Sequence, residues 1–111
     1  MDFLPNCKVW IEKDGEKVFG EGPCDILKRI KRTGSLRMAA SEINMSYSQA
    51  WQLINNLEKK IGFPLLIKKT GGEAGGGSFL TEKGEELIQK FEQFQKDAEK
   101  AFWQSFKKYF V

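Results

Sequence analysis

The amino-acid sequence predicts a mostly α-helical fold with small β-hairpins (α+β), in one domain that spans residues 1–111. Two kinds of observation predict this class. Apolar residues recur at helical spacing in three short stretches of residues 23–61 and again along residues 82–109. Short β-prone runs flank a turn signal within residues 7–20 and a glycine-rich stretch within residues 65–80. A chain of 111 residues with 41% hydrophobic residues can also bury one core.

Residues 7–20 are expected to form an N-terminal β-hairpin. Cys7–Ile11 (CKVWI) is a short β-prone run, and Asp14-Gly15 is a favourable pair for a two-residue turn. Lys17–Phe19 would then return as the second strand.

A first helix is expected from Pro23, which suits a first helical turn because it has no backbone N–H to donate. Ile26, Leu27 and Ile30 form its apolar stripe, and Gly34 would end it.

A second helix is expected after Ser35, which is a good N-cap residue. Its inward residues would be Leu36, Ala39, Ala40 and Ile43. The small alanine side chains would let a neighbouring helix approach closely. Asn44-Met45 would end this helix.

A third helix is expected to begin at Tyr47, because Ser46–Gln49 (SYSQ) matches the capping-box pattern. Its apolar stripe would consist of Ala50, Ile54, Leu57 and Ile61. Gly62 and Pro64 would stop it. Two helices, a tight turn and another helix within residues 23–61 are the helix-turn-helix arrangement.

The stretch "KKTGGEAGGGSFLT" holds five glycines between Gly71 and Gly77. Such a loop can cradle phosphate, act as a linker or join two strands. Gly71 and Gly76 have the spacing of a phosphate-binding loop, but Gly77-Ser78 follows where that motif needs Lys-Ser or Lys-Thr. Because β and helix signals adjoin the loop on both sides, we predict a wing over residues 65–80. Its tip would be formed by Gly71, Gly72, Gly75 and Gly76.

Thr81 should cap a long last helix over residues 82–109. Its apolar residues advance by alternating steps of four and three, a period that suits pairing with another helix. A lone helix of this length carries more aromatic surface than a small body can cover. We therefore expect a homodimer. The residues expected to form its interface are Leu87, Phe91, Phe94, Ala98 and Phe102.

The composition argues against an enzyme and against a metal site or cofactor. The chain has no histidine, which is the commonest general base and metal ligand. Its two cysteines, Cys7 and Cys24, are expected to be reduced thiols. Without a run of about 18 apolar residues or a secretory signal, the sequence predicts a cytoplasmic protein with no membrane partner.

Positive charge is concentrated in the middle of the chain. Residues 23–69 carry nine Lys or Arg residues against three acidic residues, whereas both flanking regions are mildly acidic. This distribution indicates a local surface for an anionic polymer. An ordinary solvated face remains the alternative, and it is the interpretation we favour for the basic residues of the first helix: Lys28, Arg29, Lys31 and Arg32.

The ordered motifs from Gly34 to Ile88 resemble the DNA-binding domain of the molybdate-responsive ModE family and, more distantly, the LysR-type winged helix-turn-helix. The resemblance rests on Ser46-Tyr47, Ala50-Trp51, the glycine pairs of the wing, and Leu80-Thr81 followed by Gly84. It covers nearly the whole chain and implies a transcriptional regulator that binds double-stranded DNA.

Two departures from that family are visible. Glu73-Ala74 stands at the wing tip, where the family usually carries a basic residue. The chain also ends at Val111, without room for an oxyanion-binding module. The resemblance therefore does not imply molybdate sensing in this polypeptide, and a separate effector protein could supply the signal.

In this fold the third helix would enter the major groove of DNA. The residues expected to face base edges are Tyr47, Ser48, Gln49, Gln52 and Asn56, with Asn55 on the same side. The residues expected to contact phosphates are Ser35, Arg37, Ser46, Lys59, Lys68 and Lys69. Because this helix lacks arginine, we expect an A·T-rich site. Trp51 is expected to pack within the protein.

Two alternatives from other classes stay open. The wing amides with Lys68 could form an oxyanion sensor for molybdate or tungstate. Glu73 favours a protein-interaction module that has lost DNA binding. A dimeric DNA-binding protein predicts a pseudo-palindromic operator, and its affinity should fall with salt, whereas an interaction module predicts little salt dependence.

Overall fold

The computed structural model describes residues 2–69 and 77–111, and the glycines predicted to form the wing tip lie outside these residues. The described chain forms four helices and two antiparallel two-stranded sheets. In chain order the elements are β1 (Ile11–Lys13), β2 (Glu16–Phe19), α1 (Glu21–Thr33), α2 (Leu36–Glu42), α3 (Tyr47–Ile61), β3 (Leu66–Lys69), β4 (Gly77–Leu80) and α4 (Glu82–Phe110). The predicted class, mostly α with small β-hairpins, is confirmed.

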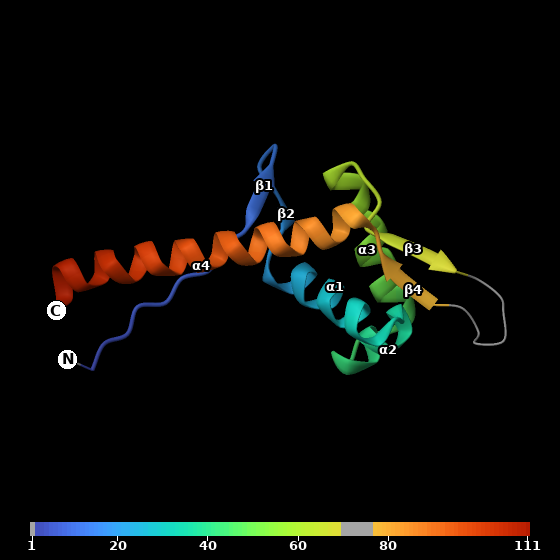
Figure 1. The fold of residues 1–111 in the computed structure, drawn as a ribbon, viewed down its shortest axis with the longest axis horizontal. Helices are drawn as coiled ribbons and strands as arrows, with labels where there is room; N and C mark the ends of the chain where they lie inside the picture. Colours follow the sequence, from blue (N-terminus) through green and yellow to red (C-terminus); the bar gives the residue numbers. More distant parts are fainter. Residues whose placement is uncertain (1, 70–76) are drawn as a thin grey trace.

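The molecule measures 59 × 31 × 22 Å, and α4 runs along its longest axis (Figure 1). The first turns of α4 contact α1 and the strand β4, whereas its C-terminal half extends beyond this body (Figure 1). The N-terminal segment runs beside that extension, so both chain termini lie at the same end (Figure 1).

The N-terminal hairpin is shorter than predicted. Its turn residues Asp14 and Gly15 have φ angles of 53° and 80°, as a tight hairpin turn requires. Pairing ends at Ile11, opposite Phe19, because the chain enters α1 immediately afterwards. The prediction that the first strand begins at Cys7 is therefore wrong, since residues 7–10 find no paired strand in the described structure.

Helices α1, α2 and α3 enclose the core. The stripe predicted for α1 is buried, and so are Leu36, Ala39 and Ala40 of α2, whereas Ile43 follows the helix and is half-buried. Ala39, Ala40 and Ala50 are at most 1% exposed where α2 approaches its neighbours. Gly34 ends α1 in the left-handed region, and Asn44 does the same after α2, with φ angles of 71° and 55°. These two turns set the angles between successive helices.

The hairpin of β3 and β4 is anchored to the helical body at several points. The strands pair in register from Leu66 with Leu80 to Lys69 with Gly77. The backbone N–H of Ser78 donates to the carbonyl of Gly34 at 3.0 Å, which ties β4 to the turn between α1 and α2. The wing strands are thereby fixed beside the helix-turn-helix.

The stripe predicted for dimerisation is divided between two environments. Phe91 is 1% exposed and packs edge-to-face on Phe19, with ring centroids 5.1 Å apart. It belongs to the core of its own chain, and its assignment to a dimer interface is corrected. Leu87 packs against the same core, Ala98 is half-buried, and Phe94 and Phe102 are 45% and 40% exposed.

Gly84 lies where α4 approaches the backbone of Leu65, just before β3. An added Cβ atom there would lie 2.8 Å from the carbonyl oxygen of Leu65, which is backbone and cannot simply rotate away. Gly84→Ala is expected to lower the free energy of unfolding by about 1–3 kcal/mol, although alanine favours helix formation. Urea denaturation measures the change. The control is Gly22→Ala, at a helical glycine whose Cβ would meet no atom within 4 Å. Equal effects of the two substitutions would refute the steric account.

Candidate nucleic-acid interface

The outward face of α3 displays a row of polar side chains. The stripe of Ala50, Ile54 and Leu57 faces the core, so the residues between these positions turn outward. All five residues predicted to face base edges are exposed: Tyr47, Ser48, Gln49, Gln52 and Asn56. Lys59, predicted to contact phosphate, is exposed as well. Asn55 is half-buried. The face presents amide and hydroxyl groups that can donate and accept hydrogen bonds at base edges.

The N-terminus of α3 is held by the predicted capping box. The Ser46 hydroxyl accepts the backbone N–H of Gln49 at 3.1 Å, and the Gln49 side-chain oxygen accepts the backbone N–H of Ser46 at 3.1 Å. Both side chains therefore organise the helix start. The oxygen of Gln49 is engaged in the cap, so contact with a base edge would use its amide NH₂ group.

The starts of α2 and α3 lie close together. The guanidinium of Arg37 lies 4.5 Å from the centre of the Tyr47 ring, a distance typical of a cation–π contact. Ser35 caps α2, and its hydroxyl accepts the backbone N–H of Met38 at 3.1 Å. Arg37 and Tyr47, one predicted to bind phosphate and the other a base, thus form a single surface.

Two further residues predicted to contact phosphates lie on β3, the first strand of the wing. Lys68 and Lys69 are residues of β3 paired with Ser78 and Gly77, but their side chains lie outside the described part of the structure. The predicted tip residues Gly71, Gly72, Gly75 and Gly76 also lie outside it. Their proposed contacts with the DNA backbone remain predictions.

Trp51 was expected to pack within the protein, but the structure does not bury it. It is 43% exposed, so it is not a core residue. With Leu36, Asn55, Glu58 and Leu66 it lines a small hollow between α3, α2 and β3. One signal was available, because Trp51 follows the stripe residue Ala50 by one position and so points about 100° away from the stripe.

The basic residues of α1 are neutralised within the chain. Lys28 binds Glu92 at 2.8 Å, Lys31 binds Glu85 at 3.4 Å, and both partners belong to α4. Next to them on α1, Arg29 and Arg32 both bind Glu42 of α2.

These contacts shift the pKa values of three side chains. Hydrogen bonds from Arg32 and then Arg29 hold the pKa of Glu42 below its usual value. The hydrogen bonds to Asp25 and Glu42 raise the pKa of Arg29, and the hydrogen bond to Glu92 raises the pKa of Lys28. The basic side chains of α1 therefore have carboxylate partners within the chain, and their exclusion from the DNA-binding set stays a prediction.

The chain has few of the side chains that commonly bind metal ions, since it has no histidine and only two cysteines. Burial, followed by the nearby carboxylate of Glu92, raises the pKa of the Cys24 thiol to about 11, so this thiol is protonated at neutral pH. Within residues 2–69 and 77–111, no group of three or more Cys, Asp or Glu side chains is placed to hold a metal ion. None of the helices in this part of the chain combines the length and apolar character of a membrane span.

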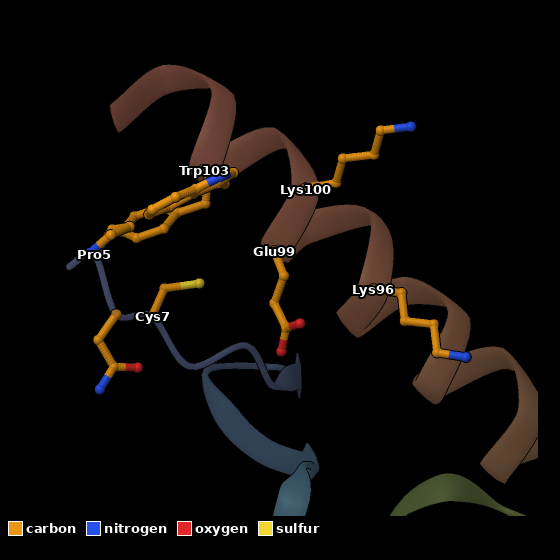
Figure 2. A pocket seen from close by; sticks show the side chains of 8 residues that line it. Pro5, Cys7, Lys96, Glu99, Lys100 and Trp103 are labelled. Carbon is orange, nitrogen blue, oxygen red and sulfur yellow. The ribbon is translucent and has the colours of Figure 1, made fainter. Parts of the chain in front are cut away.

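A hollow of about 530 Å³ lies far from α3, between the N-terminal segment and the C-terminal half of α4. Figure 2 shows Trp103 reaching from α4 toward Pro5, with Cys7 and Glu99 facing the space between the two segments and Lys100 pointing away. The hollow combines aromatic and mixed charged groups, and it adjoins the exposed part of α4 rather than the candidate DNA-binding face.

The sequence pattern of the bacterial regulatory helix-turn-helix proteins, lysR family, matches residues 24–85. The chain is 38% identical over 77 residues to the transcriptional regulator ModE of Haemophilus influenzae. The aligned residues cover 69% of this chain and 30% of that protein. The chain is 36% identical over 77 residues to the DNA-binding transcriptional dual regulator ModE of Escherichia coli K12, covering 69% and 29%. The molybdenum-pterin-binding protein MopB of Rhodobacter capsulatus is 38% identical over 80 residues, covering 72% and 29%.

Two solved structures share the fold. The DNA-binding domain of CbnR in complex with DNA superposes with a TM-score of 0.57 at 18% identity, covering 74% of this chain and 88% of that chain. ArgP from Mycobacterium tuberculosis superposes with a TM-score of 0.53 at 22% identity, covering 70% and 27%. These likenesses establish a winged helix-turn-helix fold.

The chain belongs to the bacterial regulatory helix-turn-helix proteins of the lysR family, a family of DNA-binding regulators and not of enzymes. Its relatives of known sequence include the ModE and MopB proteins, as the resemblance of its motifs implied. The chain spans about 30% of the length of these relatives.

Proposed function

We propose that this chain is a transcriptional regulator that binds double-stranded DNA as a homodimer. In this proposal α3 enters the major groove, the β3–β4 wing lies against the phosphate backbone, and the exposed part of α4 pairs two copies. The single observation that carries the proposal is that the outward face of α3 exposes a row of polar side chains. This row begins at the capped start of the helix, where Arg37 lies over the ring of Tyr47.

The relatives support this function and suggest its setting. Several are named as ModE transcriptional regulators, and the names MopB and "molybdenum transport protein ModE" refer to molybdenum. We extend a molybdenum-related role to this chain as part of the proposal. A separate effector protein that supplies the signal is part of the same proposal.

The proposed function is tested by selecting bound duplexes from a random DNA library at about 0.15 M salt, followed by sequencing. We expect enrichment of an inverted repeat with half-sites about one helical turn apart, or a multiple of that spacing. Recovery of DNA without an enriched motif would contradict the operator-specific function. Failure to recover any DNA would contradict DNA binding altogether.

A protein-interaction module is the second candidate, favoured by Glu73 at the predicted wing tip. Salt dependence separates the two functions. Contacts to several phosphates should give a slope of log affinity against log salt of about −0.9 per contact, whereas binding to a protein partner through apolar contacts should change little with salt.

A further inference from the structure

The negative charge of Glu58 lies at a position where it destabilises helix α3. The residue stands in the last turn of the helix, where the helix dipole disfavours a carboxylate, and it is the only acidic residue of Tyr47–Ile61. It also lies on the helix proposed to approach a polyanion. Its role must therefore come from contacts outside the helix.

Those contacts are with the backbone of the segment that leads into the wing. One oxygen of Glu58, Oε2, accepts the backbone N–H of Leu65 at 2.6 Å and that of Leu66 at 3.2 Å. The side chain of Leu65 is 0% exposed. A buried backbone N–H without an acceptor is strongly unfavourable, and a charged acceptor gives a stronger hydrogen bond than a neutral one.

The same short segment is held from its other side by the start of α4. The Thr81 hydroxyl donates to the carbonyl of Pro64 at 2.8 Å, and the Thr81 backbone N–H donates to the carbonyl of Leu65 at 2.8 Å. The donors of this segment are thus bound by α3 and its acceptors by α4. The direction in which β3 leaves the body is fixed by both.

We infer that Glu58 is a positioning residue that locks the wing strand β3 to α3, so that helix and wing meet DNA as one rigid surface. The inference rests on the proposed function. Glu58 also lines the hollow between α3 and β3, together with Trp51, Asn55 and Leu66.

The test compares three variants: Glu58→Ala, Glu58→Gln and, as a charge-matched control, Glu86→Ala on the exposed face of α4. Each removes one negative charge, which by electrostatics alone should strengthen binding to DNA. The inference predicts the opposite for Glu58→Ala, with binding to the selected inverted repeat weaker by about tenfold. Glu58→Gln should bind more tightly than Glu58→Ala, because both hydrogen bonds end on one oxygen and glutamine keeps an oxygen acceptor there, although a neutral one.

A second measurement tests the lock without DNA. Hydrogen exchange of the Leu65 and Leu66 amides should become at least tenfold faster in Glu58→Ala than in Glu58→Gln, while buried amides of α1 keep their rates. Tighter DNA binding by Glu58→Ala, or unchanged exchange at both amides, would overturn the inference. If the unaltered chain binds no DNA, the proposed function fails and with it the DNA-facing part of the inference, whereas the exchange rates still decide the lock.

Discussion

Replacing Phe91 with alanine is expected to lower the free energy of unfolding by about 3–5 kcal/mol. The ring is 1% exposed and packs edge-to-face on Phe19, which is equally buried. Truncation removes the apolar contacts of both rings and leaves a cavity between α4 and the N-terminal hairpin. Phe19 connects β2 to this core, so the loss should also loosen the hairpin.

The measurement is urea denaturation of Phe91→Ala beside Phe102→Ala, whose ring is 40% exposed on the same helix. Both variants should be compared at several protein concentrations, because the stability of a dimer depends on protomer concentration. The decrease in the free energy of unfolding caused by Phe91→Ala should be the same at every protein concentration. The decrease caused by Phe102→Ala should become smaller on dilution. Comparable losses at high dilution would contradict the assignment of Phe91 to the core of the single chain.

This contrast shows what periodicity can and cannot predict. Spacings of four and three along α4 identify its apolar side, and Phe91 and Phe102 both lie on that side. Periodicity carries no information on where the supporting body ends. In the structure, Phe19 of β2 packs on Phe91, whereas Phe94 and Phe102 further along α4 are exposed.

The bounds of α3 were predictable because local signals determine them. The capping box of Ser46 and Gln49 starts the helix, and Gly62 ends it with a φ angle of 88°. The start of the N-terminal hairpin was not predictable in the same way. Residues 7–10 of the β-prone run lie outside the sheet, because α1 begins at Glu21, soon after Phe19, and leaves no partner strand.

The candidate site was predictable where it depends on helix geometry. The outward residues of α3 follow from its buried stripe, and the structure exposes them. Glu58 was missed because its partners are backbone N–H groups, which any residue supplies and which leave no pattern in the sequence. The same limit applies to the charge of α1, since Glu85 and Glu92 come from a helix more than fifty positions away in the chain.

The proposed homodimer predicts a large loss of DNA affinity when the exposed part of α4 receives a charge. Phe102→Glu should convert the dimer to monomers, because a carboxylate would then face the apolar side of the partner helix. Two linked reading helices bind an inverted repeat far more tightly than one, so affinity for the full repeat should fall by about a hundredfold. Affinity for a single half-site should stay unchanged, since α3 and the wing are untouched.

Sedimentation velocity measures the oligomeric state, and fluorescence anisotropy with full-repeat and half-site duplexes measures the two affinities. The matched control is Gln104→Glu, which adds the same charge at an exposed position about 200° around the helix from Phe102. This control should remain dimeric and bind the full repeat nearly as well as the unaltered chain. A Phe102→Glu protein that stays dimeric would place the interface elsewhere on the molecule. An equal loss on half-site DNA would show that the substitution acts on the binding surface rather than on the pairing of two copies.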